Sequence, residues 1–150
     1  MRTRLSRVLA ITLAAAAACA RPAPPVITIT AINYAFQAPS NIDPGPTRFR
    51  LSNAGTVPHE VQIFVFKPGI SADSARGLLN TLERVPDSLS DSAGAVLIAA
   101  PHTTAPEEVY VELQPGRVYA LLCQFRDDSK AQRHDRLGMF GVVTVAARRL

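Results

Sequence analysis

The sequence is poor in the residues on which many catalytic and cross-linked proteins depend. It has two cysteines and three histidines in 150 residues. Two cysteines cannot build a disulfide-rich scaffold or a four-cysteine zinc site. Eight glycines, twelve prolines and 19% charged residues exclude collagen-like, wholly disordered and coiled-coil classes. There is also no phosphate-binding loop, nucleophile elbow or His-Glu-x-x-His motif, so no familiar catalytic motif is present.

The first residues have the pattern of an export signal. Three arginines within the first seven residues precede an apolar run from Val8 to Ala18, and Cys19 follows. A positive start, a short apolar stretch and small residues at its end are typical of a secretory signal peptide. This run of eleven residues is too short to span a bilayer as a helix.

The end of this segment allows two cleavage sites. Ala16-Ala17-Ala18-Cys19 resembles a bacterial lipoprotein box, in which the chain is cut before the cysteine and the cysteine is lipidated. Ordinary cleavage after Ala18-Cys19-Ala20 fits the A-x-A pattern equally well. We favour a lipoprotein signal over residues 1–18 and lipidation at Cys19. The protein is then expected outside the cytoplasm, on the periplasmic or cell-surface side, anchored to a membrane.

Removing the signal changes the charge and the cysteine count. Without residues 1–18, 13 of the 16 basic residues remain against 12 acidic ones, and the formal charge of +4 falls to +1. Basic residues cluster only at Arg148-Arg149, so we expect no nucleic-acid partner. Cys123 becomes the one cysteine of the folded part. It can be a buried inert thiol, an intermolecular bridge or a metal ligand.

The remaining chain predicts one all-β domain over residues 26–146, behind a proline-rich tether at residues 19–25. Most of it alternates apolar and polar residues, as half-buried strands do. Residues 70–84 instead have helical spacing, with Ser71 as N-cap, and residues 86–94 are expected to form a loop. Short strands separated by turns favour a β-sandwich with a helical insertion. We predict the strands at residues 26–31, 33–36, 47–52, 59–66, 95–99, 107–113, 117–124 and 139–146.

Four side chains of this sandwich could carry chemistry. His59 begins one strand, Cys123 lies near the end of another, and His134 and Met139 lie across the following loop. All four can converge at one end of a sandwich. Two imidazoles and a thiolate with a weak thioether ligand are the ligand set of a blue copper site. Each residue also has a structural interpretation, since Cys and Met often fill cores and His134 could lie exposed in its charged loop.

Several segments are similar to the cupredoxin family of plastocyanin and azurin. Asn53-Ala-Gly-Thr-Val-Pro-His59 resembles the family's first-histidine segment, Tyr119-Ala-Leu-Leu-Cys123 its Tyr-x-x-x-Cys strand, and His134 to Met139 its His-to-Met spacing. The resemblance covers nearly all of residues 26–146 and implies a Greek-key β-sandwich. The family usually places two to four residues between the cysteine and the second histidine. Here ten residues intervene, so this loop is expected to bulge outward.

The resemblance implies a ligand set and a function. His59, Cys123 and His134 would be equatorial copper ligands and Met139 the axial one. Asn53 would tie the two ligand segments together, and His134 would be the electron exit near the surface. We therefore expect an exported, monomeric type-1 copper protein that passes electrons to a redox partner protein. The alternatives are a copper-delivery lipoprotein and a metal-free interaction module. Catalytic multicopper proteins need more than three histidines, so we do not expect an enzyme.

Overall fold

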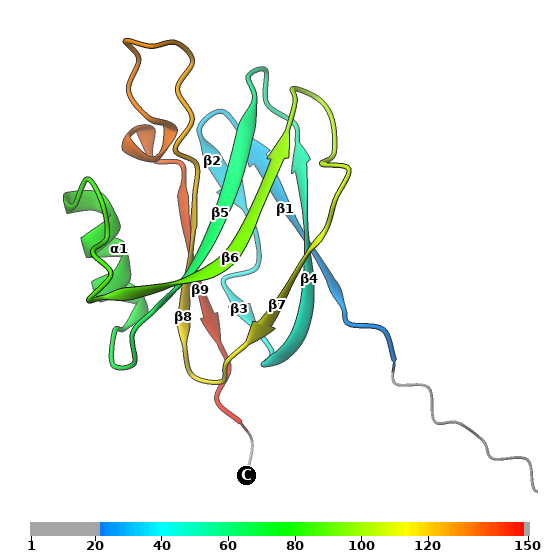
Figure 1. Ribbon diagram of the computed structural model, residues 1–150, viewed down its shortest axis with the longest axis vertical. Coiled ribbons are helices and arrows are strands. Elements are labelled where there is room, and N and C mark those ends of the chain that lie inside the picture. The colour runs from blue at the N-terminus through cyan, green and yellow to red at the C-terminus, as the bar shows by residue number, and fades with distance from the viewer. Residues whose placement is uncertain (1–21, 149–150) are drawn as a thin grey trace, which may run out of the picture.

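A computed structural model describes residues 22–148 of the chain, except for the side chains of residues 92–94. Two β-sheets face each other, and one helix covers part of the second sheet (Figure 1). This confirms the sandwich with a helical insertion. The first sheet has the strand order β2-β1-β4-β7, made of β1 (Val26–Ile32), β2 (Ala35–Gln37), β4 (Gly45–Asn53) and β7 (Val109–Leu113). The second has the order β3-β9-β8-β5-β6, made of β3 (Asn41–Ile42), β5 (His59–Phe66), β6 (Ser90–Ala99), β8 (Val118–Leu122) and β9 (Phe140–Val145).

The main core lies between the two sheets. Alternate residues of β4 and β5 point inward, and the apolar ones among them pack with side chains from the facing strands. Ile29 and Leu51 of the first sheet and Val61 and Leu121 of the second are at most 1% exposed. The alternation of apolar and polar residues in the sequence therefore corresponds to strands that bury one face in this core.

A smaller core lies under helix α1 (Ala72–Thr81). Ala75 and Leu79 of the helix pack on Phe66, Ala120 and Val142 of the second sheet. Because the helix covers the outer face of β8, all five residues of that strand are buried. Ser71 caps the helix, and its hydroxyl accepts the N–H of Ser74 at 3.1 Å. The helical insertion and its N-cap are confirmed, although the helix ends at Thr81 rather than beside Pro86.

Residues 90–94 differ from the prediction. They were expected in a loop, but β6 already begins at Ser90, and Phe66 pairs with Ser90 and Phe64 with Ser92. The register shifts between Ile63 and Phe64. A polar segment forms a strand here because its neighbour β5 offers backbone partners, which outweighs its weak intrinsic preference.

The proposed signal segment, including Cys19, lies outside the described residues. Residues 22–25 have no regular structure, yet the carbonyl of Pro25 accepts the N–H of Arg48 at 2.8 Å. Val26 then begins β1, which runs toward Asn33 and the far end of the sandwich (Figure 1). Among the described helices, none combines the length and the apolar character that crossing a membrane requires.

Candidate metal centre

Cys123 directly follows β8 and is completely buried. It packs in the same inner core as Tyr119 and Leu121, which confirms that the three side chains share the core face. Its N–H donates to the carbonyl of Met139 at 3.2 Å. The thiol is therefore fixed between the end of one central strand and the start of β9.

His59 begins β5 and is also fully buried. Its Nδ1 lies 3.8 Å from Cys123 Sγ, and its Nε2 lies 3.0 Å from Asn33 Oδ1. An amide oxygen only accepts, so this contact places the ring proton on Nε2 and leaves the lone pair of Nδ1 facing the thiol. Gly55 makes room for the arrangement, because a Cβ there would collide with Asn33 Oδ1 and lie 2.9 Å from His59 Nε2.

His134 returns to the site at the end of the ten-residue loop. Its N–H donates to the carbonyl of Phe125 at 2.8 Å, and the N–H of Asp135 donates to that of Cys123 at 2.8 Å. His134 then begins a short 3₁₀ turn, η1 (His134–Leu137), and its Nδ1 lies 3.4 Å from Cys123 Sγ. The loop bulges outward as expected (Figure 1). His134 is 1% exposed, so the structural alternative of a solvent-exposed histidine in this charged loop is wrong.

The three donor atoms form a compact triangle. The Nδ1 atoms of His59 and His134 are 3.2 Å apart, and Cys123 Sγ is 3.8 and 3.4 Å from them. A point equidistant from three atoms at these separations lies about 2.0 Å from each, which is within metal-ligand reach. Among the described residues, this is the one group of three or more His, Cys, Asp or Glu side chains arranged to hold a metal ion.

Burial shapes the electrostatics of this triangle in the metal-free protein. Desolvation raises the pKa of the Cys123 thiol to about 11, although the N–H of Glu60, 3.4 Å from Sγ, opposes the shift. Desolvation and the neighbouring His134 lower the pKa of His59 to about 4. Neutral imidazoles with unprotonated Nδ1 atoms are the form that binds a metal, and a bound metal ion would drive the proton off the thiol.

Met139 is fully buried in the inner core and follows the His134 turn. Its N–H donates to the carbonyl of His134 at 2.9 Å, and its own carbonyl accepts the N–H of Cys123. Gly138, with φ of +103°, turns the chain between them. Met139 is thus tied to both neighbouring candidate ligands through its backbone. The third histidine, His102, is exposed and is not part of this cluster.

Glu60, rather than Asn53, links the two ligand segments. The Asn53 amide donates to the carbonyls of Val57 and Ala99 at 2.9 and 3.1 Å, so its side chain braces the segment before His59. Glu60 is 6% exposed, and its Oε1 accepts the N–H of Gln124 at 3.0 Å. The role predicted for Asn53 is therefore corrected, because its described side-chain bonds stay on the His59 side.

Two further residues cover His134 from the outside. Asp127 Oδ1 lies 3.0 Å from His134 Nε2, and Asp127 Oδ2 accepts the Tyr34 hydroxyl. The Tyr34 ring lies 4.8 Å from the His134 ring, centroid to centroid. Hydrogen bonds from Tyr34 and then His134 lower the pKa of Asp127. The sequence did not predict these contacts, and the signal for them was an acidic residue in the ten-residue loop between Cys123 and His134.

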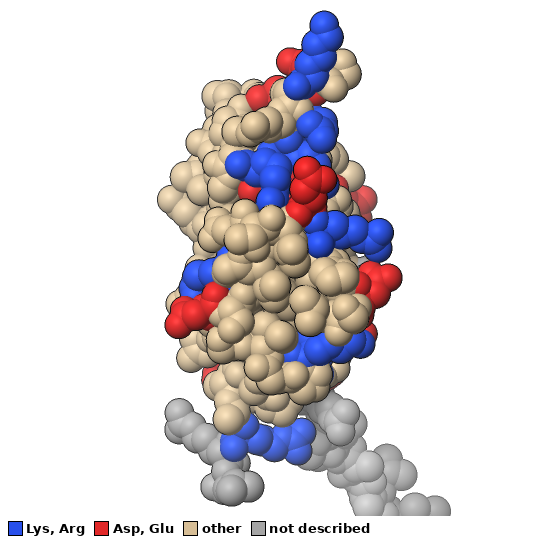
Figure 2. Space-filling model, turned by 90° about the vertical axis from the view of Figure 1, so that its left-hand side faces the viewer, with Lys and Arg blue, Asp and Glu red and all other residues tan. Residues whose placement is uncertain are grey.

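Charged side chains of both signs lie beside this site on the face of α1 and the long loop (Figure 2). Arg133 and Arg136 both pair with the buried carboxylate of Asp135, at 3.0 and 3.5 Å. The same two guanidinium groups donate to the carbonyls of Glu83 and Leu79 at the end of the helix. These two arginines therefore connect the end of the loop that carries His134 to the C-terminal end of α1.

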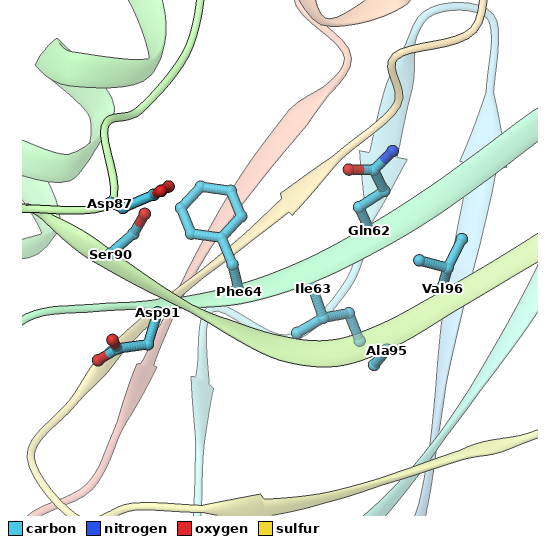
Figure 3. Close-up of a pocket in the computed structure, with 8 residues that line it drawn as sticks. All are labelled: Gln62, Ile63, Phe64, Asp87, Ser90, Asp91, Ala95 and Val96. Atoms are coloured by element: carbon cyan, nitrogen blue, oxygen red, sulfur yellow. The ribbon is translucent and has the colours of Figure 1, made fainter.

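A groove of about 610 Å³ lies elsewhere, over the bulge between β5 and β6 (Figure 3). None of the four predicted ligands lines it. Its walls are a mixture of apolar and polar side chains, namely Gln62, Ile63, Phe64, Asp87, Ser90, Asp91, Ala95 and Val96. The described part of the chain offers no cluster of metal-binding side chains in this groove.

Comparison with solved structures identifies the fold. No family model matches the sequence, and no curated protein matches it. Reduced auracyanin from the photosynthetic bacterium Roseiflexus castenholzii is 20% identical, with a TM-score of 0.50 over 83% of this chain and 98% of that one. Reduced rusticyanin is 15% identical, with a TM-score of 0.50 over 83% of this chain and 81% of that one. The described chain has the cupredoxin fold of these proteins.

Proposed function

We propose that the protein is an exported type-1 copper protein that transfers single electrons to and from a redox partner protein. His59, Cys123 and His134 would be the equatorial ligands and Met139 the axial one. The observation that carries the proposal is the triangle of two Nδ1 atoms and one Sγ, whose sides are 3.2, 3.4 and 3.8 Å. Thiolate and imidazole donors suit copper, and a His₂Cys set with a distant thioether is the pattern of electron-transfer sites.

The surrounding residues suit an electron carrier. Copper, when bound, supplies a one-electron couple, and the protein must hold its ligands still between the two oxidation states. Asn33 and Asp127 fix the outer nitrogens of the two imidazoles. The backbone bonds among Cys123, His134 and Met139 fix the three C-terminal candidates against one another. Such outer contacts orient ligands and tune a metal site.

Copper titration of the purified mature protein tests the assignment. Cu(II) should produce an intense visible thiolate-to-copper band that is absent from Cys123→Ala. His102→Ala is the matched control, because it removes an exposed histidine outside the cluster, and its band should be unchanged. A colourless wild-type protein, or a band that survives Cys123→Ala, contradicts the proposal.

Reduction of the copper-loaded protein separates electron transfer from copper delivery. A carrier should cycle reversibly between its two oxidation states and keep its metal, which is measured by voltammetry followed by metal analysis. Release of copper upon reduction would instead indicate delivery. The buried ligands favour retention, since none of the three donor residues is more than 1% exposed.

We also propose that Cys19 carries a lipid anchor. The support is the signal-like segment before it and the position of the tether, which joins β1 at Val26, the opposite end of the strand from Asn33 and the site (Figure 1). Seven residues of strand separate the two ends by about 23 Å. An anchored protein would thus direct the site away from the membrane. Labelled fatty acid should be incorporated by the wild type and not by Cys19→Ala, and equal labelling of both contradicts the anchor.

A further inference from the structure

The ten-residue loop between Cys123 and His134 brings a carboxylate to the outer side of the histidine ring. Asp127 lies within the loop, and its Oδ1 is 3.0 Å from His134 Nε2. The loop base is closed by the backbone bonds from His134 to Phe125 and from Asp135 to Cys123. The position of Asp127 relative to the ring is therefore set by short backbone connections as well as by its own contact.

Tyr34, in the turn between β1 and β2 of the first sheet, holds this carboxylate. Its hydroxyl donates to Asp127 Oδ2, the oxygen that does not face His134. The Tyr34 ring also packs against the His134 ring at 4.8 Å. Two oxygens of one carboxylate are thus bound by two different groups, which restricts the rotation of Asp127 although its side chain is 34% exposed.

The contact determines which nitrogen of His134 can bind a metal. A carboxylate accepts hydrogen bonds and does not donate them, so the ring proton of His134 belongs on Nε2. Nδ1 then keeps its lone pair and faces Cys123 Sγ at 3.4 Å. His59 is fixed in the same way by Asn33 Oδ1, but that acceptor is neutral. Of the two imidazoles, only that of His134 has an anionic hydrogen-bond partner.

We propose that Asp127, held by Tyr34, is a positioning residue that fixes the Nδ1-donor form of His134 and lowers the reduction potential of the copper site. This inference rests on the proposed function. A carboxylate behind a ligating imidazole raises its basicity, and its negative charge favours the more positive oxidation state of the metal. Both effects stabilise Cu(II) relative to Cu(I).

The reduction potentials of Asp127→Asn and Asp128→Asn test this proposal. Asp128 is the matched control, because it lies in the same loop, carries the same charge and accepts the N–H groups of Lys130 and Ala131 instead of a histidine. For Asp127→Asn the ratio of Cu(II) to Cu(I) affinity should fall about tenfold, which raises the potential by about 59 mV for a one-electron couple. Asp128→Asn should change the ratio less than about twofold, since exposed charges are screened.

Tyr34→Phe adds an intermediate case. It keeps the ring against His134 but removes the hydroxyl that holds Asp127, so its potential should lie between those of the wild type and Asp127→Asn. Equal shifts of the reduction potential in Asp127→Asn and Asp128→Asn would mean that the net charge of the protein alone changes the potential. That result, or an unchanged or lower potential in Asp127→Asn, overturns the proposal.

The metal-free protein gives an independent readout. Nitrogen NMR should show His134 protonated at Nε2 in the wild type and a mixture of tautomers in Asp127→Ala, while Asp128→Ala keeps the wild-type signal. A wild type protonated at Nδ1, or no change in Asp127→Ala, overturns the proposed role of Asp127. A protein that binds no copper refutes the proposed function instead, and the NMR result still decides the contact between Asp127 and His134.

Discussion

Replacing Glu60 separates the contribution of its accepted hydrogen bond to the stability of the fold from the contribution of its negative charge. Glu60→Ala removes the acceptor of the Gln124 N–H, which it binds at 3.0 Å directly after Cys123. Leaving such a partly buried donor without a partner costs about 1–3 kcal/mol. At about 4 °C per kcal/mol for a domain of this size, the melting temperature of the metal-free protein should fall by about 4–12 °C. Glu60→Gln keeps an accepting oxygen and should lose less than half of this.

Thermal unfolding of the metal-free protein, followed by circular dichroism, measures these differences. Glu112→Ala is the matched control, because it removes an exposed carboxylate that binds only the Tyr110 hydroxyl among the side-chain contacts described. Its stability should change by less than about 0.5 kcal/mol. If Glu60→Gln were as unstable as Glu60→Ala, the charge rather than the accepted N–H would matter. A Glu60→Ala protein as stable as the wild type would refute the reasoning altogether.

Three other outcomes are expected. Gly55→Ala should weaken copper binding about tenfold or more, because its Cβ collides with Asn33 and crowds His59 Nε2. Competition with a copper chelator measures the affinity. Gly77→Ala, at an open position, is the control and should bind copper like the wild type. The metal-free protein should lose stability as the pH falls from about 6.5 to about 4. The reason is that the pKa of His59 is depressed in the folded state, so the unfolded chain takes up the proton first. Constant stability in denaturant titrations across this pH range would contradict the prediction. Leu79→Ala should lower the free energy of unfolding by about 2–5 kcal/mol in denaturant titrations, because this side chain on the buried face of α1 is 1% exposed. Arg76 is exposed on the same helix, and Arg76→Ala should change the free energy of unfolding little.

The strands with one buried face were predictable from the sequence, and the start of β6 was not. Apolar residues at every second position of β5 face the inner core, so their periodicity reports directly on burial. Ser90 and Asp91 have no such pattern. They become a strand because β5 provides the backbone partners, and this pairing between distant segments leaves no local trace in the sequence.

The candidate ligands were predictable as residue types, but their surroundings required the fold. His59 and Cys123 occupy strand ends with inward-facing neighbours, which the alternation indicates. The burial of His134 was not visible, because the residues around it are charged and charged loops are usually exposed. Asp127 and Tyr34 reverse that expectation by covering the ring. Tyr34 comes from a turn 93 residues away from Asp127 in the chain.

The long spacing between Cys123 and His134 is a small energetic obstacle to a compact site. For a flexible loop, closing ten residues rather than three costs only about 1 kcal/mol more. The two backbone hydrogen bonds at the base of this loop, each 2.8 Å long, contribute about as much or more. The chain can therefore lengthen between these two residues without moving them apart. The additional residues then become free to bring new groups to the site, as Asp127 shows.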